Sequence, residues 1–310
     1  MMITEIQRRA FSLKIKRDST FFSCYPNPKF PTISITGDYC ALSCKHCGRR
    51  YLRHMISCPD PDVLFTTCSK LAANGARGVL ISGGYNSEGY VPLEPFLEAI
   101  ARIKRGLGLF LNVHTGLIPH ELACELGRVG VDMASVDLIG GNETIELVLG
   151  IKKTTRDYER VLRELRQAVP HVVPHICIGL HEGKIEGEAK ALEIVAKIQA
   201  TALVFLVLVP TTGTPFEKIN PLSPSVVGRV IADARLKFPA ATIALGCMRP
   251  RGNKRAEFEL QALYSGVDRI EIPSEQTIKA ARELGLEVRR LDACCAVPDE
   301  LTRVLTWSST

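Results

Sequence analysis

The sequence predicts an α/β fold, a (βα)8 TIM-type barrel with a short N-terminal segment and a C-terminal tail over the barrel mouth. Short β-branched apolar runs alternate with segments of helical period, and polar or glycine-rich residues collect just after the runs. This alternation favours parallel pairing, because each helical crossover returns the chain to the same end of the sheet. In such barrels the chemistry lies on the loops that follow the strands.

The apolar runs are expected to be strands, and several stretches between them have a clear helical period. The expected strands are Thr32–Thr36, Gly78–Ser82, Leu109–His114, Val131–Asp137, Val172–Ile178, Ala202–Val209, Thr242–Gly246 and Val267–Ile272. The clearest helical stretches are Leu93–Arg105, Tyr158–Ala168, Glu186–Ile198 and Ser225–Lys237.

The barrel is expected to span residues 30–275, between an N-terminal segment (1–29) and a C-terminal extension (276–310). No run of about 18 apolar residues occurs, which argues against a membrane partner. Residues 1–16 lack the apolar stretch of a secretory signal, so a cytoplasmic location is expected. The net charge of +6 is mild and its Lys and Arg residues are scattered, which argues against a nucleic-acid partner.

Three cysteines stand close together in the loop after the first expected strand. The chain has 11 cysteines, and in a reducing compartment such a number favours metal or redox chemistry over disulfides. Cys40, Cys44 and Cys47 have the spacing C-x3-C-x2-C, so three thiolates can surround one iron–sulfur cluster. One iron then has no protein ligand, and it can chelate the amino and carboxylate groups of a cofactor.

A zinc site is the structural alternative for this loop. It would use the three cysteines together with His46. His46 is adjacent to Cys47 and would point away from it, and zinc sites usually take ligand pairs from two separated segments. The iron–sulfur interpretation is therefore preferred.

This triplet, in this loop, resembles the signature of the radical S-adenosylmethionine (SAM) superfamily. An aromatic residue often precedes the third cysteine in that family, and His46 departs from this pattern. The resemblance implies a [4Fe-4S] cluster with SAM, fed with electrons by a reductant such as ferredoxin. The reduced cluster would cleave SAM to methionine and a 5′-deoxyadenosyl radical that takes a hydrogen atom from the substrate, while the barrel positions the substrate and excludes water.

Two later segments resemble motifs of that family that bind the amino group and ribose of SAM. Ser82, Gly83 and Gly84 follow the second strand, where the family has Gly-Gly-Glu and binds the amino group through exposed backbone. Tyr85 replaces the glutamate here, so only the backbone role carries over. The fourth strand ends in Ser135 and Asp137, which suit a ribose diol, with a helix N-cap as the alternative role for Asp137.

Two further segments complete the resemblance. Ile176, Gly179 and Glu182 resemble the fifth-strand motif that packs on adenine. The residues from Thr211 to Pro215 resemble the Gly-Thr-Pro turn after the sixth strand. Together the motifs occur in the family's order over about residues 30–275.

Within the superfamily, the motif order and the segment Thr154–Tyr158 resemble biotin synthases. That group holds a second, sulfur-donating cluster with cysteines on the second, third and fifth barrel strands. The matching places here carry no cysteine, so biotin synthesis by that route is not expected; they carry Ile81, Asn112, His114, Val172 and Val173.

Other cysteines fall where a second cluster could form. Cys247 follows the seventh strand, and Cys294 and Cys295 lie in the tail. We expect Cys247 and at least one of the tail pair to hold an auxiliary iron–sulfur cluster, because adjacent cysteines seldom both reach one cluster. Whether Cys24 is the fourth ligand stays open.

The segment Gly246–Pro250 and the late cysteine pair resemble the archaeal-type two-component lipoyl synthases. This resemblance implies sulfur insertion into a protein-bound octanoyl chain, with an octanoylated lipoyl-carrier protein and a related second synthase subunit as partners. Another radical SAM enzyme with one cluster, an isomerase, dehydrogenase or methyltransferase, is the first alternative. A zinc-bound interaction protein is the second.

Overall fold

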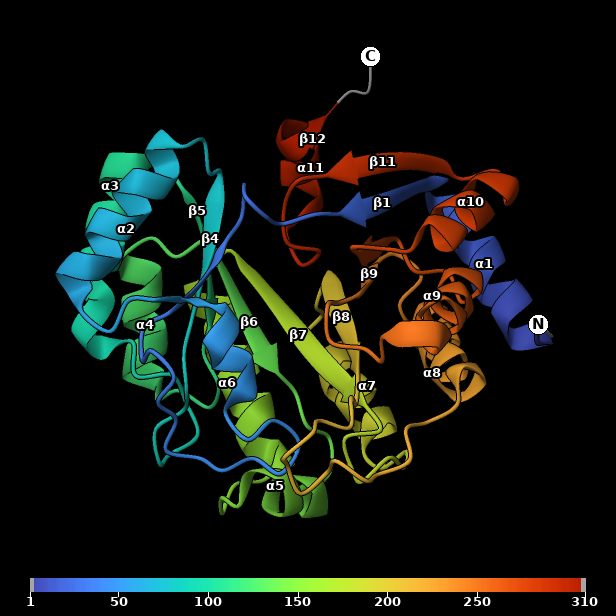
Figure 1. Ribbon diagram of the computed structural model, residues 1–310, viewed down its shortest axis with the longest axis horizontal. Helices are drawn as coiled ribbons and strands as arrows, with labels where there is room; N and C mark the ends of the chain where they lie inside the picture. Colours follow the sequence, from blue (N-terminus) through green and yellow to red (C-terminus); the bar gives the residue numbers. More distant parts are fainter. Residues whose placement is uncertain (1–2, 308–310) are drawn as a thin grey trace.

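The structure is a single curled sheet of 12 strands wrapped by helices (Figure 1). This computed structural model describes residues 3–307, with side chains described as far as residue 302. The strand order is β12-β11-β1-β10-β9-β8-β7-β6-β5-β4-β2-β3, and every pair is parallel except β11 with β12. The strands are β1 (Thr20–Cys24), β2 (Thr32–Ser34), β3 (Ile56–Ser57), β4 (Gly78–Ser82), β5 (Phe110–His114), β6 (Met133–Asp137), β7 (His171–Ile178), β8 (Ala202–Val207), β9 (Thr242–Leu245), β10 (Arg269–Glu271), β11 (Glu287–Leu291) and β12 (Thr306–Trp307).

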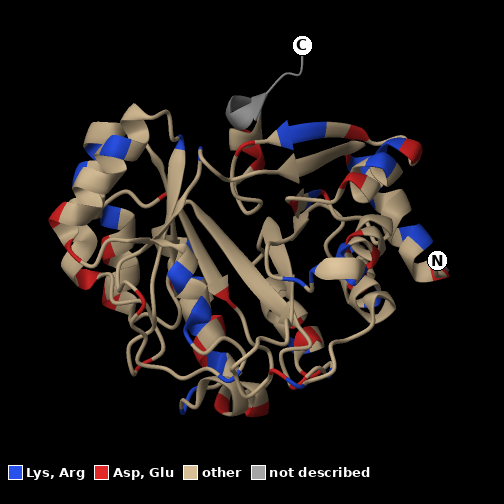
Figure 2. Ribbon diagram, in the orientation of Figure 1, with Lys and Arg blue, Asp and Glu red and all other residues tan. Residues whose placement is uncertain are grey.

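Helices cover the outer face of the sheet, and the charged residues concentrate on them (Figures 1 and 2). The α-helices are α1 (Glu5–Arg17), α2 (Pro61–Ala73), α3 (Leu97–Leu107), α4 (His120–Arg128), α5 (Asn142–Leu149), α6 (Thr155–Ala168), α7 (Glu188–Lys197), α8 (Pro224–Lys237), α9 (Arg255–Tyr264), α10 (Glu275–Glu283) and α11 (Asp299–Leu305). Three short 3-10 helices add Arg50–His54, Glu94–Phe96 and Gly252–Lys254. Within residues 3–307, none of the helices is both long enough and apolar enough to cross a membrane.

The predicted α/β barrel-type fold is confirmed, as a sheet that curls into a half-barrel and keeps two edges. All eight expected strands are present as β2 and β4 to β10. Two strands outside the predicted barrel limits of 30–275 belong to the same sheet, since β1 and β11 pair with each other and β1 also pairs with β10. The sequence hides β11 because its charged residues, from Glu287 to Arg290, stay at least partly exposed near the sheet edge and leave no apolar run. The predicted extension ends at residues 308–310, which lie outside those described.

Alternate residues of each strand divide the interior into two apolar cores, as the period-two geometry of a strand requires. The larger core lies between the sheet and its helices. The smaller core lines the inner face, the lumen of the half-barrel, and it includes Leu80, Met133, Val173, Val204 and Ala244. Further along the same strands the inward positions become polar. The lumen is therefore apolar near the strands' N-terminal ends and polar near their C-terminal ends.

The C-terminal tail enters the lumen instead of covering the barrel mouth, which corrects the expectation for residues 276–310. Ala293, Ala296 and Val297 are buried in the smaller core together with small strand residues. A cavity of about 160 Å³ lies where the segment 296–300 meets the N-terminal ends of β7, β8 and β9. Small side chains on β8 and β9 leave room for the tail, and burial of its apolar residues favours this position.

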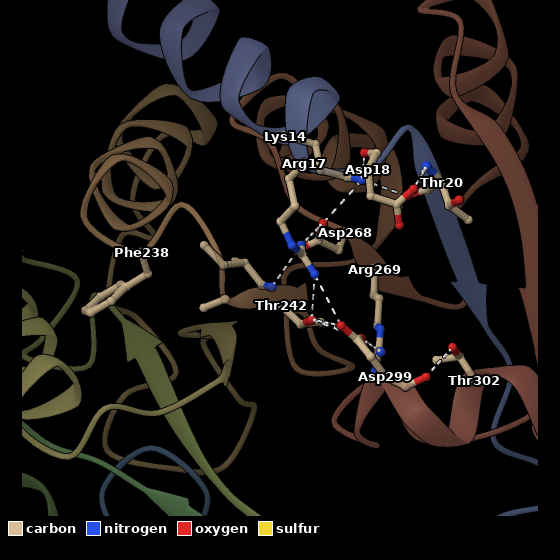
Figure 3. Close-up of polar contacts among 12 residues, drawn as sticks. Lys14, Arg17, Asp18, Thr20, Phe238, Thr242, Asp268, Arg269, Asp299 and Thr302 are labelled. Carbon is tan, nitrogen blue, oxygen red and sulfur yellow. Dashed lines mark hydrogen bonds and ion pairs between the residues drawn. The ribbon is translucent and has the colours of Figure 1, made fainter.

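A buried carboxylate, Asp268, ties the N-terminal helix to the strands (Figure 3). It accepts a hydrogen bond from Arg17 at 2.7 Å and another from the buried Arg235, and Lys14 lies 3.3 Å away. The backbone N–H of Ile243 also donates to it at 2.8 Å. Burial lowers the pKa of Lys14, and the neighbouring Asp268 charge partly opposes that shift.

A second ion pair continues this network to the tail (Figure 3). Arg269 is fully buried, pairs with Asp299 and donates to the backbone carbonyls of Cys295 and Val297. Asp299 also accepts hydrogen bonds from Thr242 and Arg17. The tail is thus fastened to β9, β10 and α1 by charged hydrogen bonds, which are stronger than neutral ones.

We predict that Asp268→Asn lowers the free energy of unfolding by about 3 to 5 kcal/mol, because it leaves buried cations without their counter-charge. Urea denaturation measures the change. The matched control is Asp233→Asn, whose partner Arg229 is 61% exposed, and it should cost less than about 1 kcal/mol. Equal effects of the two substitutions would contradict a central role for Asp268.

Candidate functional site

The cysteine triplet lies in the loop after β2, at the C-terminal edge of the sheet. Cys40 and Cys44 are buried and Cys47 is partly exposed. The loop is fixed by backbone hydrogen bonds, in which Ala41 N–H donates to Tyr85 at 2.7 Å and Lys45 N–H donates to Val148 at 3.0 Å. The three thiols are therefore held by contacts with the loop after β4 and with the end of α5.

The glycines after β4 pack directly against this loop. Gly84 N–H donates to Thr36 Oγ1 at 2.7 Å, and Tyr85 N–H donates to Cys40 Sγ at 3.2 Å. A Cβ on Gly84 would lie 2.0 Å from the Tyr39 carbonyl oxygen and 2.5 Å from the Cys40 Cβ. Only glycine allows this approach. The lack of a side chain at Gly84 lets the cysteine loop pack against it. This requirement is separate from the predicted role of Ser82, Gly83 and Gly84, which is to bind a cofactor's amino group through their backbone.

The thiols of Cys44 and Cys47 affect each other. A hydrogen bond from Cys44 lowers the pKa of Cys47 and raises that of Cys44 itself. The interaction favours the thiolate of Cys47, the form that binds metal. Three thiols on one loop, with a cradle that a Cβ would fill, fit a cluster held by three cysteines.

The Thr211–Pro215 turn, which follows β8, lies against the same loop. Tyr51 Oη is 3.0 Å from Thr211 Oγ1, and Phe216 N–H donates to the Lys45 carbonyl at 3.3 Å. Burial raises the pKa of Tyr51, and charge on Cys47, Cys177 or Cys247 raises it further. Tyr51 therefore lies beside the turn and near His46 of the triplet loop, a position that the sequence did not reveal.

Asp137 ends β6 on the inner face and is exposed to the lumen. Its charge affects the pKa of surrounding groups that are neutral at neutral pH, namely His46, Tyr85, His114, Tyr158, His175 and Cys177. Burial lowers the pKa of His46 and of His175 to about 4. A carboxylate among neutral groups in a cleft is suited to accept hydrogen bonds from a diol. Its predicted companion Ser135 is buried and donates to Asn112 Oδ1 at 3.0 Å.

The fifth-strand motif is arranged differently from the expectation. Ile176 packs into the core between sheet and helices, so only its backbone can face a cofactor. Gly179 has φ +79°, which requires glycine, whereas Glu182 is exposed. The buried carboxylate at this turn is Glu188, which accepts a hydrogen bond from Gly179 N–H at 2.8 Å. Sequence reasoning missed Glu188 because it stands beyond the motif, at the first position of α7.

The cysteines expected to hold a second cluster converge on the inner face. Cys294 and Cys295 both lie near the Glu271 carboxylate, and the three donor atoms are within 4.8 Å of one another. Surrounding protein raises the pKa of Cys247 to about 12, with smaller contributions from Glu271 and Cys294. Cys24, fully buried at the end of β1, is similarly affected by Glu271 and Cys294. Both tail cysteines thus reach the same place, so either or both of them can serve the expected cluster.

The second group lies where β9 and β10 end: Cys247 follows Gly246, whose carbonyl shares the Arg249 guanidinium with the carbonyl of Glu271. Sequence reasoning missed Glu271, whose only signal is its place at the end of a strand. Cys177 is partly buried and stands on the same side of β7 as His175. Cys58 and Cys68 are buried and Cys124 is exposed.

The chain matches the family model described as "Radical SAM superfamily" over residues 34–192, just over half of its length. Its curated relatives include biotin synthases. The enzyme of Prochlorococcus marinus is 27% identical over 201 residues, which cover 62% of this chain and 59% of the relative. The enzyme of Halorhodospira halophila is 26% identical over 240 residues, or 74% and 71%. The matches thus span about half to seven-tenths of these relatives' lengths.

Solved structures resemble this fold at low sequence identity. Methylornithine synthase superposes with a TM-score of 0.63 at 15% identity, over 91% of this chain and 88% of that one. HydG, a maturase of the [FeFe]-hydrogenase, superposes with a TM-score of 0.69 at 13% identity, over 97% and 70%. These similarities establish the fold and leave the reaction open.

We predict that Gly84→Ala reduces the iron content by up to about four per chain, because the added methyl group displaces Tyr39 and Cys40. Iron and sulfide determination after anaerobic reconstitution measures the loss. Gly106→Ala is the matched control, since a Cβ at Gly106 meets nothing within 4 Å. It should keep its iron and stabilise helix α3 by about 0.5 to 1 kcal/mol. A Gly84→Ala protein with full iron content would contradict the packing role.

Proposed function

The chain belongs to the radical SAM superfamily, which implies a [4Fe-4S] cluster with SAM, and on that premise we propose that it inserts sulfur into a protein-bound octanoyl chain as a lipoyl synthase component. The octanoyl chain would arrive on a lipoyl-carrier protein. A related second synthase subunit and a reductant such as ferredoxin would complete the system. The proposed ligands of the first cluster are Cys40, Cys44 and Cys47.

One observation carries the proposal: a second group of thiols lies on the inner face of the same half-barrel. Cys294 and Cys295 lie beside Glu271, and the exposed Cys247 follows Gly246, whose carbonyl shares Arg249 with the carbonyl of Glu271. Sulfur insertion requires a sulfur source beside the substrate radical, and a cluster held at this place would provide it. A radical SAM enzyme with a single cluster has no need of this convergence.

The chain's own residues would bind and orient the reactants. The bound [4Fe-4S] cluster with SAM supplies the radical chemistry. Asp137 would bind the ribose of SAM, the backbone of Ser82, Gly83 and Gly84 its amino group, and the turn at Gly179 its adenine. Neutral His114 and His175, whose rings pack edge to face at 5.4 Å, line the lumen beyond Asp137. Their low pKa keeps this part of the lumen uncharged, which suits an alkyl chain.

The curated relatives named biotin synthase support sulfur insertion as the reaction class and provide the competing substrate. The third-strand positions that would carry a cysteine in the biotin synthase pattern hold Asn112 and His114. Asn112 is fully buried, and its Nδ2 lacks a hydrogen-bond partner among the described residues. These residues favour a different placement of the second cluster, in agreement with an octanoyl substrate.

The deciding experiment incubates the reconstituted enzyme with SAM, reductant and an octanoyl-lysyl peptide, with and without candidate partner subunits. We predict that Cys247→Ala still cleaves SAM but forms no sulfur-inserted product and loses up to about four irons per chain. Mass spectrometry of the peptide and measurement of 5′-deoxyadenosine provide the two readouts.

Cys124→Ala, which removes an exposed thiol on α4, is the matched control and should behave as the unaltered chain. If the same preparation instead formed biotin, the proposed octanoyl substrate would be wrong, but the proposed reaction class, sulfur insertion, would stand. A chain that reconstitutes to only about four irons would instead favour a single-cluster enzyme.

We also predict that Asp137→Ala weakens SAM binding at least about tenfold, corresponding to about 1.4 kcal/mol, while the first cluster keeps its iron. The substitution removes a hydrogen-bond acceptor and leaves every cysteine ligand in place. Isothermal titration with SAM measures the affinity. Unchanged affinity would exclude a ribose contact, and Asp233→Asn on the exposed face of α8 serves as the control for loss of a carboxylate.

A further inference from the structure

Glu271 ends β10 with its side chain among cysteines. One of its carboxylate oxygens and the sulfurs of Cys294 and Cys295 all lie within 4.8 Å of one another. Cys24, also described by the structure, does not share that mutual distance, although it is the register partner of Glu271 on β1. The three donors of this group are therefore one carboxylate and two thiols, and they come from segments more than 20 residues apart.

The carboxylate of Glu271 has no cation partner within ion-pair distance among the residues whose side chains are described. The surrounding arginines are used elsewhere: Arg249 and Arg255 pair with Glu259, and Arg269 pairs with Asp299. Glu271 is partly buried, and burial of a carboxylate costs free energy unless the group is neutral, paired or bound to metal. A metal ligand role accounts for this carboxylate among thiols.

Arg249 holds the backbone of both donor-bearing segments together. It is buried and donates to the carbonyls of Gly246 at 2.7 Å and Glu271 at 2.8 Å. Gly246 immediately precedes Cys247, so one guanidinium fixes the spacing between Cys247 and Glu271. The fold thus builds a rigid support for these side chains.

The backbone just after Glu271 is strained. Ile272 has φ +44°, a conformation that β-branched residues rarely adopt. Its N–H donates to the Cys24 carbonyl at 2.8 Å, which keeps the end of β10 against β1. Strain of this kind persists where surrounding contacts over-determine it, often at functional sites.

We propose that Glu271 is the non-cysteine ligand of the second iron–sulfur cluster, binding one iron through its carboxylate while Cys247, Cys294 and Cys295 bind the others. This rests on the second cluster of the proposed function. Thiolates are the preferred ligands of iron–sulfur clusters, and a carboxylate is a harder donor. The iron it holds therefore differs from the other three and is released more easily, as suits a cluster whose sulfide is consumed.

The test isolates the second cluster by replacing Cys40, Cys44 and Cys47 with alanine in the full chain. After anaerobic reconstitution with iron and sulfide, this background should keep about four irons per chain. We expect Glu271→Gln to make one iron labile, so that mild oxidation yields a three-iron form detectable by EPR. Glu271→Cys should resist that loss, and its Mössbauer spectrum should lack the distinct iron site of the parent. Opposite shifts by the two variants are expected only at a ligand position.

Two controls distinguish ligand loss from misfolding. Glu275→Gln removes an exposed carboxylate four positions away and should change neither iron content nor spectrum. Circular dichroism and thermal unfolding of each variant before reconstitution report the fold, and Glu271→Cys provides rescue where Glu271→Gln loses iron.

Each other outcome overturns the proposal in a recognisable way. If both Glu271 variants kept four irons and had identical spectra, Glu271 would not be a ligand, and the second cluster would still be supported. Loss of iron in Cys24→Ala but not in Glu271→Gln would make Cys24 the fourth ligand. If the protein that lacks Cys40, Cys44 and Cys47 bound no iron, or bound one metal ion without sulfide, it would have no second cluster. The case for sulfur insertion would then fail as well.

Discussion

The structure depends on the buried charge of Asp268, because it joins the two ends of the chain to the sheet. Arg17 of α1 and the buried Arg235 of α8 both donate to it, and Arg17 also reaches Asp299 of the tail. Arg269, the next residue along the chain, pairs with Asp299 and holds the tail backbone. Buried ion pairs of this kind are costly to break singly, so they favour one arrangement of α1, β10 and the tail. That arrangement brings Cys24 and Cys295 into the same small core.

The half-barrel provides two sites because its inner face changes character along the strands. Small apolar residues near the N-terminal ends accommodate the tail, whereas His114, His175 and Asp137 make the C-terminal region polar. The cysteine triplet approaches this region from the loop after β2, and Tyr51 lies beside that loop. A substrate carbon held between the two sites would face SAM on one side and a sulfur source on the other. In the proposed reaction the lumen would supply this proximity.

Backbone packing, as much as side-chain chemistry, sets the geometry of both sites. Gly84 has no side chain, so the Cys40 loop can lie directly on the end of β4. Arg249 serves the second site in a similar way, because it bonds to the carbonyls of both Gly246 and Glu271. Its pair with Glu259 is itself buried, and although burial opposes the charge, Arg249 lowers the pKa of Glu259 to about 2. The donors are thus presented by rigid backbone before any cluster binds.

The sequence by itself determined the alternation of strands and helices, the superfamily and the cysteine triplet, because these are written in local spacing and periodicity. All eight expected strands are present, and Cys40, Cys44 and Cys47 lie on the predicted loop. Only the tertiary structure decided the place of β1 and β11, the entry of the tail into the lumen, and the meeting of Glu271 with Cys294 and Cys295. These features depend on contacts between residues far apart in the chain, and such contacts leave no periodic signal in either segment. Glu188 is nearer in the chain to its partner Gly179, but it stands beyond the motif, so only the fold of the turn shows that the two are bonded.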